Sequence, residues 1–175
     1  MKPETRAFLR ASARSWVSND LDRVGPYWLQ WVWTLLFSAV LAVGFTALGY
    51  VLFGHRGPMR SLDGVLTWYG KNLVVCLTVA GVIHLLFDGL GHLVGGAAAM
   101  KHWKDWQRSL FFGGVPIVGV ALGWPLGVTL AGGDVLRWVS GENGRSVVML
   151  SLSTSLVLTF FFHHWFSAKA RQYHA

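Results

Sequence analysis

The chain has 175 residues, which is enough for a single domain, and it carries a formal net charge of +7. Hydrophobic residues make up 53% of it and charged residues only 13%, far below the roughly 25% charged residues of soluble domains. This composition excludes an ordinary soluble domain. The positive charges lie between long apolar runs, so they indicate an anionic membrane surface rather than nucleic acid. The single cysteine, Cys76, excludes a disulfide framework within the chain.

Residues 1–27 form a basic leader. Leu9, Ala13, Trp16 and Val17 share one helical face, and Arg6, Arg10 and Arg14 share another. This pattern predicts a short helix that lies on the inner leaflet of the membrane. A mobile basic tail is the alternative. Gly25 and Pro26 then break the chain before the first long apolar stretch.

Four apolar stretches are long enough to cross a membrane, for which a helix needs about 20 residues. They cover residues 28–53, 66–93, 110–130 and 146–166. The first and third contain no charge, whereas the second and fourth also carry polar side chains. The first is longer than the apolar core of a signal peptide, so we expect a retained anchor. Aromatic residues such as Tyr27, Trp31 and Trp68 gather near the ends of these stretches, as in an interfacial belt.

The distribution of Lys and Arg predicts the orientation of the spans. Ten of these residues lie in the leader, in the loop between the second and third spans, and after the fourth span, whereas five lie on the other side. Both termini are therefore predicted to be cytoplasmic, which an even number of spans also requires. The sequence predicts an all-α, multi-pass protein of the bacterial inner membrane. Its four-helix bundle covers residues 28–167, and a cytoplasmic signalling helix begins at residues 168–175.

The second span carries the ionisable residues of greatest interest. His84, Asp88 and His92 are spaced by four, so they share one helix face. Ionisable groups inside a membrane tend to face the protein interior, to pair, or to carry function. His163 and His164, near the inner end of the fourth span, are predicted to lie at a similar depth to His92. Three interpretations remain open: a polar network that holds the helices together, a pH or ligand sensor, and a metal or haem site.

The third span contains a glycine face formed by Gly119, Gly123 and Gly127, again spaced by four. Such a face lets another helix approach closely, and van der Waals contact then stabilises the pair. The neighbour is either another helix of the same chain or a second copy. Pro116 and Pro125 are predicted to kink this helix or to free a backbone carbonyl.

No phosphate-binding glycine loop, nucleophile elbow or zinc-finger spacing occurs in the sequence, so no catalytic residue is assigned. The outer loops, at about residues 54–65 and 131–145, are too short for a folded sensor domain. Any stimulus must therefore be small, carried by lipid, or sensed within the bilayer. Good helix formers follow Phe166, so the fourth span is predicted to continue into the cytoplasm. A short protein with a frayed helical end is the alternative.

Four stretches around the spans are distinctive: PYWLQWVWTLLF, WYGKNLVV, WQRSLFFGGVPIVGVALGWPLG and FFFHHWFSAKARQ. Together they resemble the N-terminal membrane region of LytS-type sensor histidine kinases from gamma-proteobacteria. The resemblance implies a two-component sensor, whose last span leads to a phosphoacceptor segment and an ATP-binding domain that act on a response regulator. This chain contains neither motif, so no catalytic residue is carried over to it.

The leading expectation is a membrane-embedded sensor and anchor domain, which relays a helix rearrangement to a cytoplasmic output domain. Its expected partners are the lipid bilayer, a second copy of the chain and a response regulator, and no cofactor is expected. The alternative is a small membrane redox protein that binds metal or haem through His84, Asp88, His92 or His163. A transporter or channel would need a polar path at all depths, toward which the first and third spans offer little.

Overall fold

The computed structural model describes residues 3–18, 24–53, 58–100 and 102–141, together with Met149 and Ser153. Within these residues the regular structure is helical throughout, which confirms the all-α prediction for the described part of the chain. The predicted fourth span, at 146–166, lies outside this part except for Met149 and Ser153, which are both helical.

Three of the described helices are long and apolar enough to cross a membrane. They are α2 (Tyr27–Phe53), α3 (Leu62–Leu93) and α5 (Asp105–Leu130). These helices confirm the first three predicted stretches as apolar helices of spanning length. The chain is therefore a membrane protein by the length and composition of these helices. The number of spans and the side on which each terminus lies stay predictions.

The remaining elements are short or basic. They are α1 (Pro3–Ser18), the 3₁₀ turn η1 (Pro58–Arg60), α4 (Gly96–Met100) and α6 (Val135–Ser140). The leader is thus helical over most of its length. That α1 lies on the inner leaflet stays a prediction.

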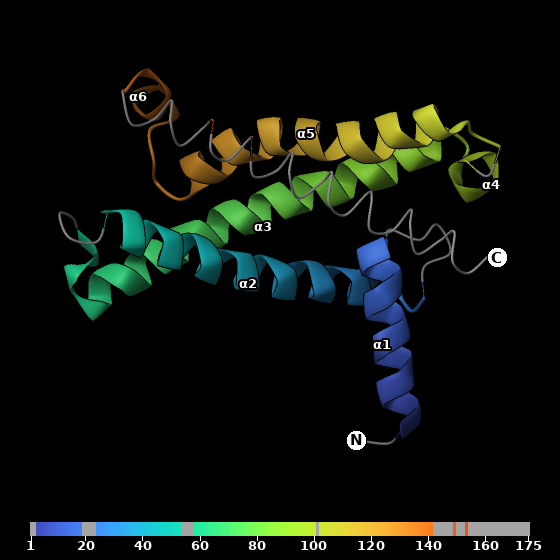
Figure 1. The fold of residues 1–175 in the computed structure, drawn as a ribbon, viewed down its shortest axis with the longest axis horizontal. Coiled ribbons are helices and arrows are strands. Elements are labelled where there is room, and N and C mark those ends of the chain that lie inside the picture. The colour runs from blue at the N-terminus through green and yellow to red at the C-terminus, as the bar shows by residue number, and fades with distance from the viewer. Residues whose placement is uncertain are drawn as a thin grey trace.

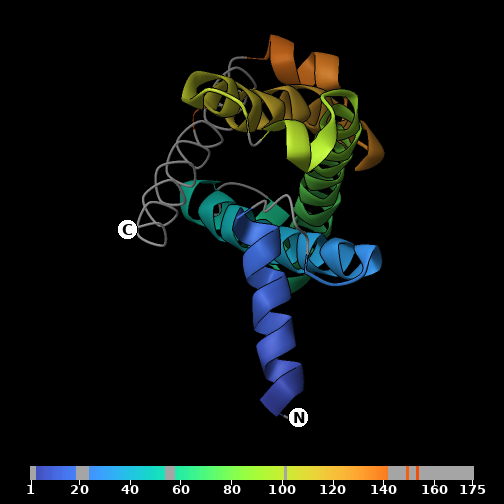
Figure 2. The same ribbon diagram turned by 90° about the vertical axis from the view of Figure 1, so that its right-hand side faces the viewer.

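Helix α3 is the central element of the described bundle, since it packs against α2 on one side and α5 on the other (Figure 1). Helix α1 runs crosswise to these three helices at the end where α2 begins, and it projects away from them (Figures 1 and 2). Helix α4 lies at that same end, whereas α6 lies at the opposite end (Figure 1).

Local signals explain where the central helices begin and how far they reach. Ser61 caps α3, because its Oγ accepts a hydrogen bond from the Gly64 amide at 3.1 Å. At 1.5 Å per residue the 32 residues of α3 extend about 48 Å, which exceeds the roughly 30 Å of a hydrocarbon core. Helix α3 must therefore tilt or extend beyond the core. Helix α5 continues through both Pro116 and Pro125.

Apolar side chains are exposed on the outside of the bundle, and polar side chains are buried along α2. Large apolar side chains on the outer sides of α2 and α5, among them Val40, Val51, Leu110 and Leu122, are exposed. A bilayer supplies an apolar environment for such side chains. Most of the buried positions along α2 are instead polar, so the polar face of this helix points at the rest of the protein.

Candidate functional site: a polar joint between α2 and α3

A carboxylate joins the first residue of α2 to the last third of α3. The Tyr27 hydroxyl donates a hydrogen bond of 2.7 Å to Oδ2 of Asp88. The Nε2 atom of His84, one turn before Asp88, lies 3.6 Å from the same oxygen. The side chains of His84 and Asp88 are only 10% and 17% exposed. This carboxylate oxygen thus accepts a hydrogen bond from the phenol, and the imidazole lies near it, just beyond hydrogen-bond distance. These three residues are called the polar joint below.

Aromatic rings surround the imidazole of this joint. The ring of Trp31 lies 4.5 Å from that of His84, centroid to centroid, and the ring of Tyr27 lies 5.9 Å from it. Trp31 also lies over Gly81, where an added Cβ would meet the indole at 3.8 Å. Trp31 and Tyr27 both belong to α2, so they fix the imidazole of α3 against the neighbouring helix.

The structure brings together only part of the predicted histidine cluster. His84 and Asp88 are in contact, whereas His92, one turn further along α3, has an exposed side chain. His163 and His164 lie outside the described residues. Within residues 3–18, 24–53, 58–100 and 102–141, no three His, Cys, Asp or Glu side chains are grouped as a metal site requires. The metal or haem alternative stays a prediction.

A row of polar residues on α2 was missed by the sequence reasoning. Gln30, Thr34, Ser38 and Thr46 are all buried and spaced by multiples of four, with Ala42 completing the row. Two of them also contact α3: the Asn72 amide donates to Thr46 Oγ1 at 3.0 Å, and the Ser38 hydroxyl, which donates mainly within its own helix, lies 3.4 Å from the Cys76 carbonyl. This polar seam meets α1 through Thr34 and α3 through Ser38 and Thr46. The four-residue spacing was the signal that could have revealed it.

The seam holds helices together rather than forming a polar path. The hydroxyls of Thr34, Ser38 and Thr46 each donate to the carbonyl four residues earlier, at 3.0, 2.8 and 2.7 Å. Such back-bonding satisfies the hydroxyl proton inside its own helix. Small polar side chains also let helices approach closely and add short interhelical bonds. The seam therefore gives no support to the transporter alternative.

Helix α1 is fixed to the same face of α2. The indole N–H of Trp16 donates to Thr34 Oγ1, and the indole N–H of Trp33 donates to Ser12 Oγ, both at 3.1 Å. Trp16 also packs edge-on against Phe37, with ring centroids 5.4 Å apart. The leader helix is thus anchored at the end of α2 that carries the polar joint.

The predicted glycine face packs within the chain. A Cβ built on Gly123 would lie 2.7 Å from the Cα of Val79, and one on Gly127 would lie 2.9 Å from the Cα of Val75. A Cβ on Gly119 would overlap Ile83. All three contacts are made with α3, so α5 and α3 approach so closely that only glycine fits. Of the two neighbours that the sequence allowed, the structure places a helix of the same chain against this face.

No family model, curated protein or solved structure matches this chain. The resemblance to LytS-type sensor kinases and the roles that it implies therefore stay predictions.

Proposed function

We propose that this chain is the membrane-embedded sensor and anchor module of a bacterial two-component system, with its termini on the cytoplasmic side of the inner membrane. The proposal rests chiefly on the polar joint, in which Tyr27 of α2 donates a hydrogen bond to the Asp88 carboxylate of α3 and His84 lies beside that carboxylate. Ionisable residues within membrane helices are costly, so a buried pair that meets a neighbouring helix suits a functional element. The clustered basic residues support the orientation.

The two helix interfaces of α3 differ in kind. Against α5 the backbones are in contact along three glycines, and dispersion energy would be lost all along this stripe if the helices separated. Against α2 the contact includes a few directional polar contacts that are spread along most of α2. A hydrogen bond can be exchanged for one to water or a headgroup at modest cost. The α2–α3 interface is thus the lower-cost place for two alternative packings.

The proposed mechanism follows from this difference. A small or lipid-borne stimulus acts at the α2–α3 interface and changes the hydrogen bonding of the Asp88 carboxylate. Helices α3 and α5 then shift together relative to α2. The shift is passed to a cytoplasmic output domain, which as the resemblance implies would be a dimeric kinase core acting on a response regulator.

The test joins this chain to the catalytic core of a LytS-type kinase through its C-terminal end, in several helical registers, and measures autophosphorylation in membranes. Asp88→Asn removes a charged acceptor, and hydrogen bonds to charged groups contribute about 1.5–3 kcal/mol. Such a loss changes a two-state population ratio about tenfold or more. We therefore expect Asp88→Asn and Tyr27→Phe to change the rate severalfold in at least one register.

The matched control is Asp63→Asn, because Asp63 is an exposed carboxylate in the first turn of the same helix. It should leave the rate unchanged. Spin labels on the exposed Val40 of α2 and Leu85 of α3 report the helix movement in the chain alone, in a Cys76→Ala background. Equal rates and equal distance distributions for wild type, Asp88→Asn and Asp63→Asn would refute the proposal.

A further inference from the structure

Helix α1 presents two chemically different sides. Arg6, Arg10 and Arg14 are spaced by four and all three are exposed, so they form one row along the helix. Ser12 and Ser15 are buried on a different side. The row extends over about 12 Å, at 1.5 Å per residue.

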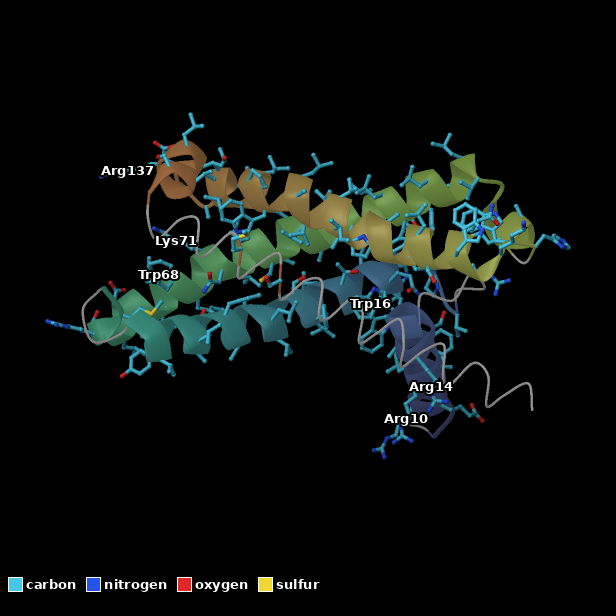
Figure 3. The ribbon with its side chains drawn as sticks, turned by 45° about the horizontal axis from the view of Figure 1, so that its top comes forward. Arg10, Arg14, Trp16, Trp68, Lys71 and Arg137 are labelled. Atoms are coloured by element: carbon cyan, nitrogen blue, oxygen red, sulfur yellow. The ribbon has the colours of Figure 1, made fainter. Side chains whose placement is uncertain are left out.

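The docking of α1 fixes the position of this arginine row. Trp16 of α1 donates to Thr34 of α2, and Trp33 of α2 donates to Ser12 of α1. The Val24 amide also donates to Ser15 Oγ at 3.1 Å just before α2 begins. Helix α1 consequently runs crosswise to the spans and extends past the bundle (Figures 1 and 2). Because spans follow the membrane normal, a crosswise helix at their end runs along the membrane surface. Figure 3 shows Arg10 and Arg14 on this projecting helix, at the end opposite to Lys71 and Arg137.

We propose that α1 is a binding surface for anionic phospholipid headgroups, which Arg6, Arg10 and Arg14 contact through their guanidinium groups. A guanidinium matches the oxygens of a phosphate in a bidentate geometry. The row is longer than a single phosphate and lies beside the bundle, where several headgroups are within reach. Lys104 and Arg108 are exposed at the start of α5, near the same end of the spans, and extend the basic surface. This inference does not depend on the signalling role proposed above.

Headgroup binding at this surface would also act on α2. The indole of Trp16 is hydrogen-bonded to Thr34, a buried member of the polar seam. A change in the charge of the leaflet therefore reaches a span through one side chain. Anionic phospholipid is the occupant that the position and the charge of α1 favour together, since a basic row at the bilayer surface meets that leaflet first.

The experiment places a fluorophore on α1 of the full chain, at Ala7→Cys in a Cys76→Ala background, and reconstitutes the protein in phosphatidylcholine nanodiscs. Nitroxide-labelled phosphatidylglycerol or phosphatidylcholine is then added at equal mole fraction. The ratio of their quenching measures local enrichment of the anionic lipid. One basic residue near an anionic leaflet favours association about fivefold. We expect a ratio of at least about twofold at low salt, since the probe averages over several lipids.

Variants decide whether the arginine row causes the enrichment. Arg6→Gln/Arg10→Gln should bring the ratio to about one, whereas Arg137→Gln, at an exposed arginine of α6 near the other end of the bundle, should leave it unchanged. Arg6→Lys/Arg10→Lys keeps the charge but loses the bidentate geometry, so the ratio should fall between those of the wild type and the double Gln variant. The inference is overturned by equal quenching in the wild type or by enrichment that survives the double Gln variant. It is also overturned if inorganic phosphate abolishes enrichment when sodium chloride of equal ionic strength does not, because the site would then bind a free anion.

Discussion

Replacing Gly123 by alanine should force α5 away from α3. The added Cβ would lie 2.7 Å from the Cα of Val79, whereas two carbon atoms in contact lie about 3.5–4.0 Å apart. The contacting atom belongs to the backbone, so no side-chain rotation can relieve the overlap. The helices must separate locally by roughly 1 Å, a gap that forfeits about a quarter to a half of the dispersion energy of each affected atom pair. Overpacking of this kind typically costs about 1–3 kcal/mol.

The matched control for this change is Gly114→Ala on the same helix. No atom of the described residues lies within 4 Å of a Cβ built on Gly114. Both substitutions gain the same helix propensity, up to about 1 kcal/mol, so their difference isolates the packing cost. The free energy of unfolding, measured by far-UV circular dichroism while a denaturing detergent is titrated into mixed micelles, should be about 1–3 kcal/mol lower for Gly123→Ala. Equal stability of the two variants would refute the close α3–α5 contact.

Three further changes probe the other contacts. Tyr27→Phe keeps the ring but removes the donor to Asp88, and it should lower the free energy of unfolding by about 1 kcal/mol in the same titration; an unchanged value would contradict the hydrogen bond between Tyr27 and Asp88. Trp16→Phe removes the donor to Thr34 and should cost about 0.6 kcal/mol, with faster hydrogen exchange in α1 as its signature. Cys76 is buried, so its thiol should react slowly with maleimide in mild micelles and fully after denaturation, whereas rapid labelling in mild micelles would show that α3 is not packed as described.

The spans could be predicted because the bilayer imposes their length and apolar composition. The predicted span at 28–53 matches α2 at both ends, and the predicted span at 110–130 matches the end of α5. They agree because an uninterrupted apolar run has few alternative structures in lipid. The i, i+4 spacing of His84 and Asp88 likewise fixed their proximity, because helix geometry alone brings such residues onto one face. The glycine face was predicted for the same reason.

Contacts between helices could not be predicted in this way. Tyr27 belongs to the expected interfacial belt, yet its hydroxyl reaches a carboxylate 61 positions along the chain. Average hydropathy also hides the polar seam, because single hydroxyl residues barely alter an apolar stretch. In the leader, the apolar residues predicted to form its binding face include Leu9, but the most buried side chains of α1 are Ser12 and Ser15. Both accept hydrogen bonds, from Trp33 and from the Val24 amide respectively, and such contacts depend on the approach of a second segment.

The placement of these contacts gives α2 a particular role in the described bundle. Helix α5 packs against α3 by close van der Waals contact, through a glycine face that leaves no room for a side chain. Helix α2 is instead held by polar groups on both of its neighbours, through Trp16 of α1 and through Asp88 and Asn72 of α3. Shape-based packing resists change until the helices part, whereas polar contacts respond to charge and to competing donors. A perturbation of the membrane surface at α1 and one at the polar joint therefore both act on α2, the first through Trp16 and the second through Tyr27.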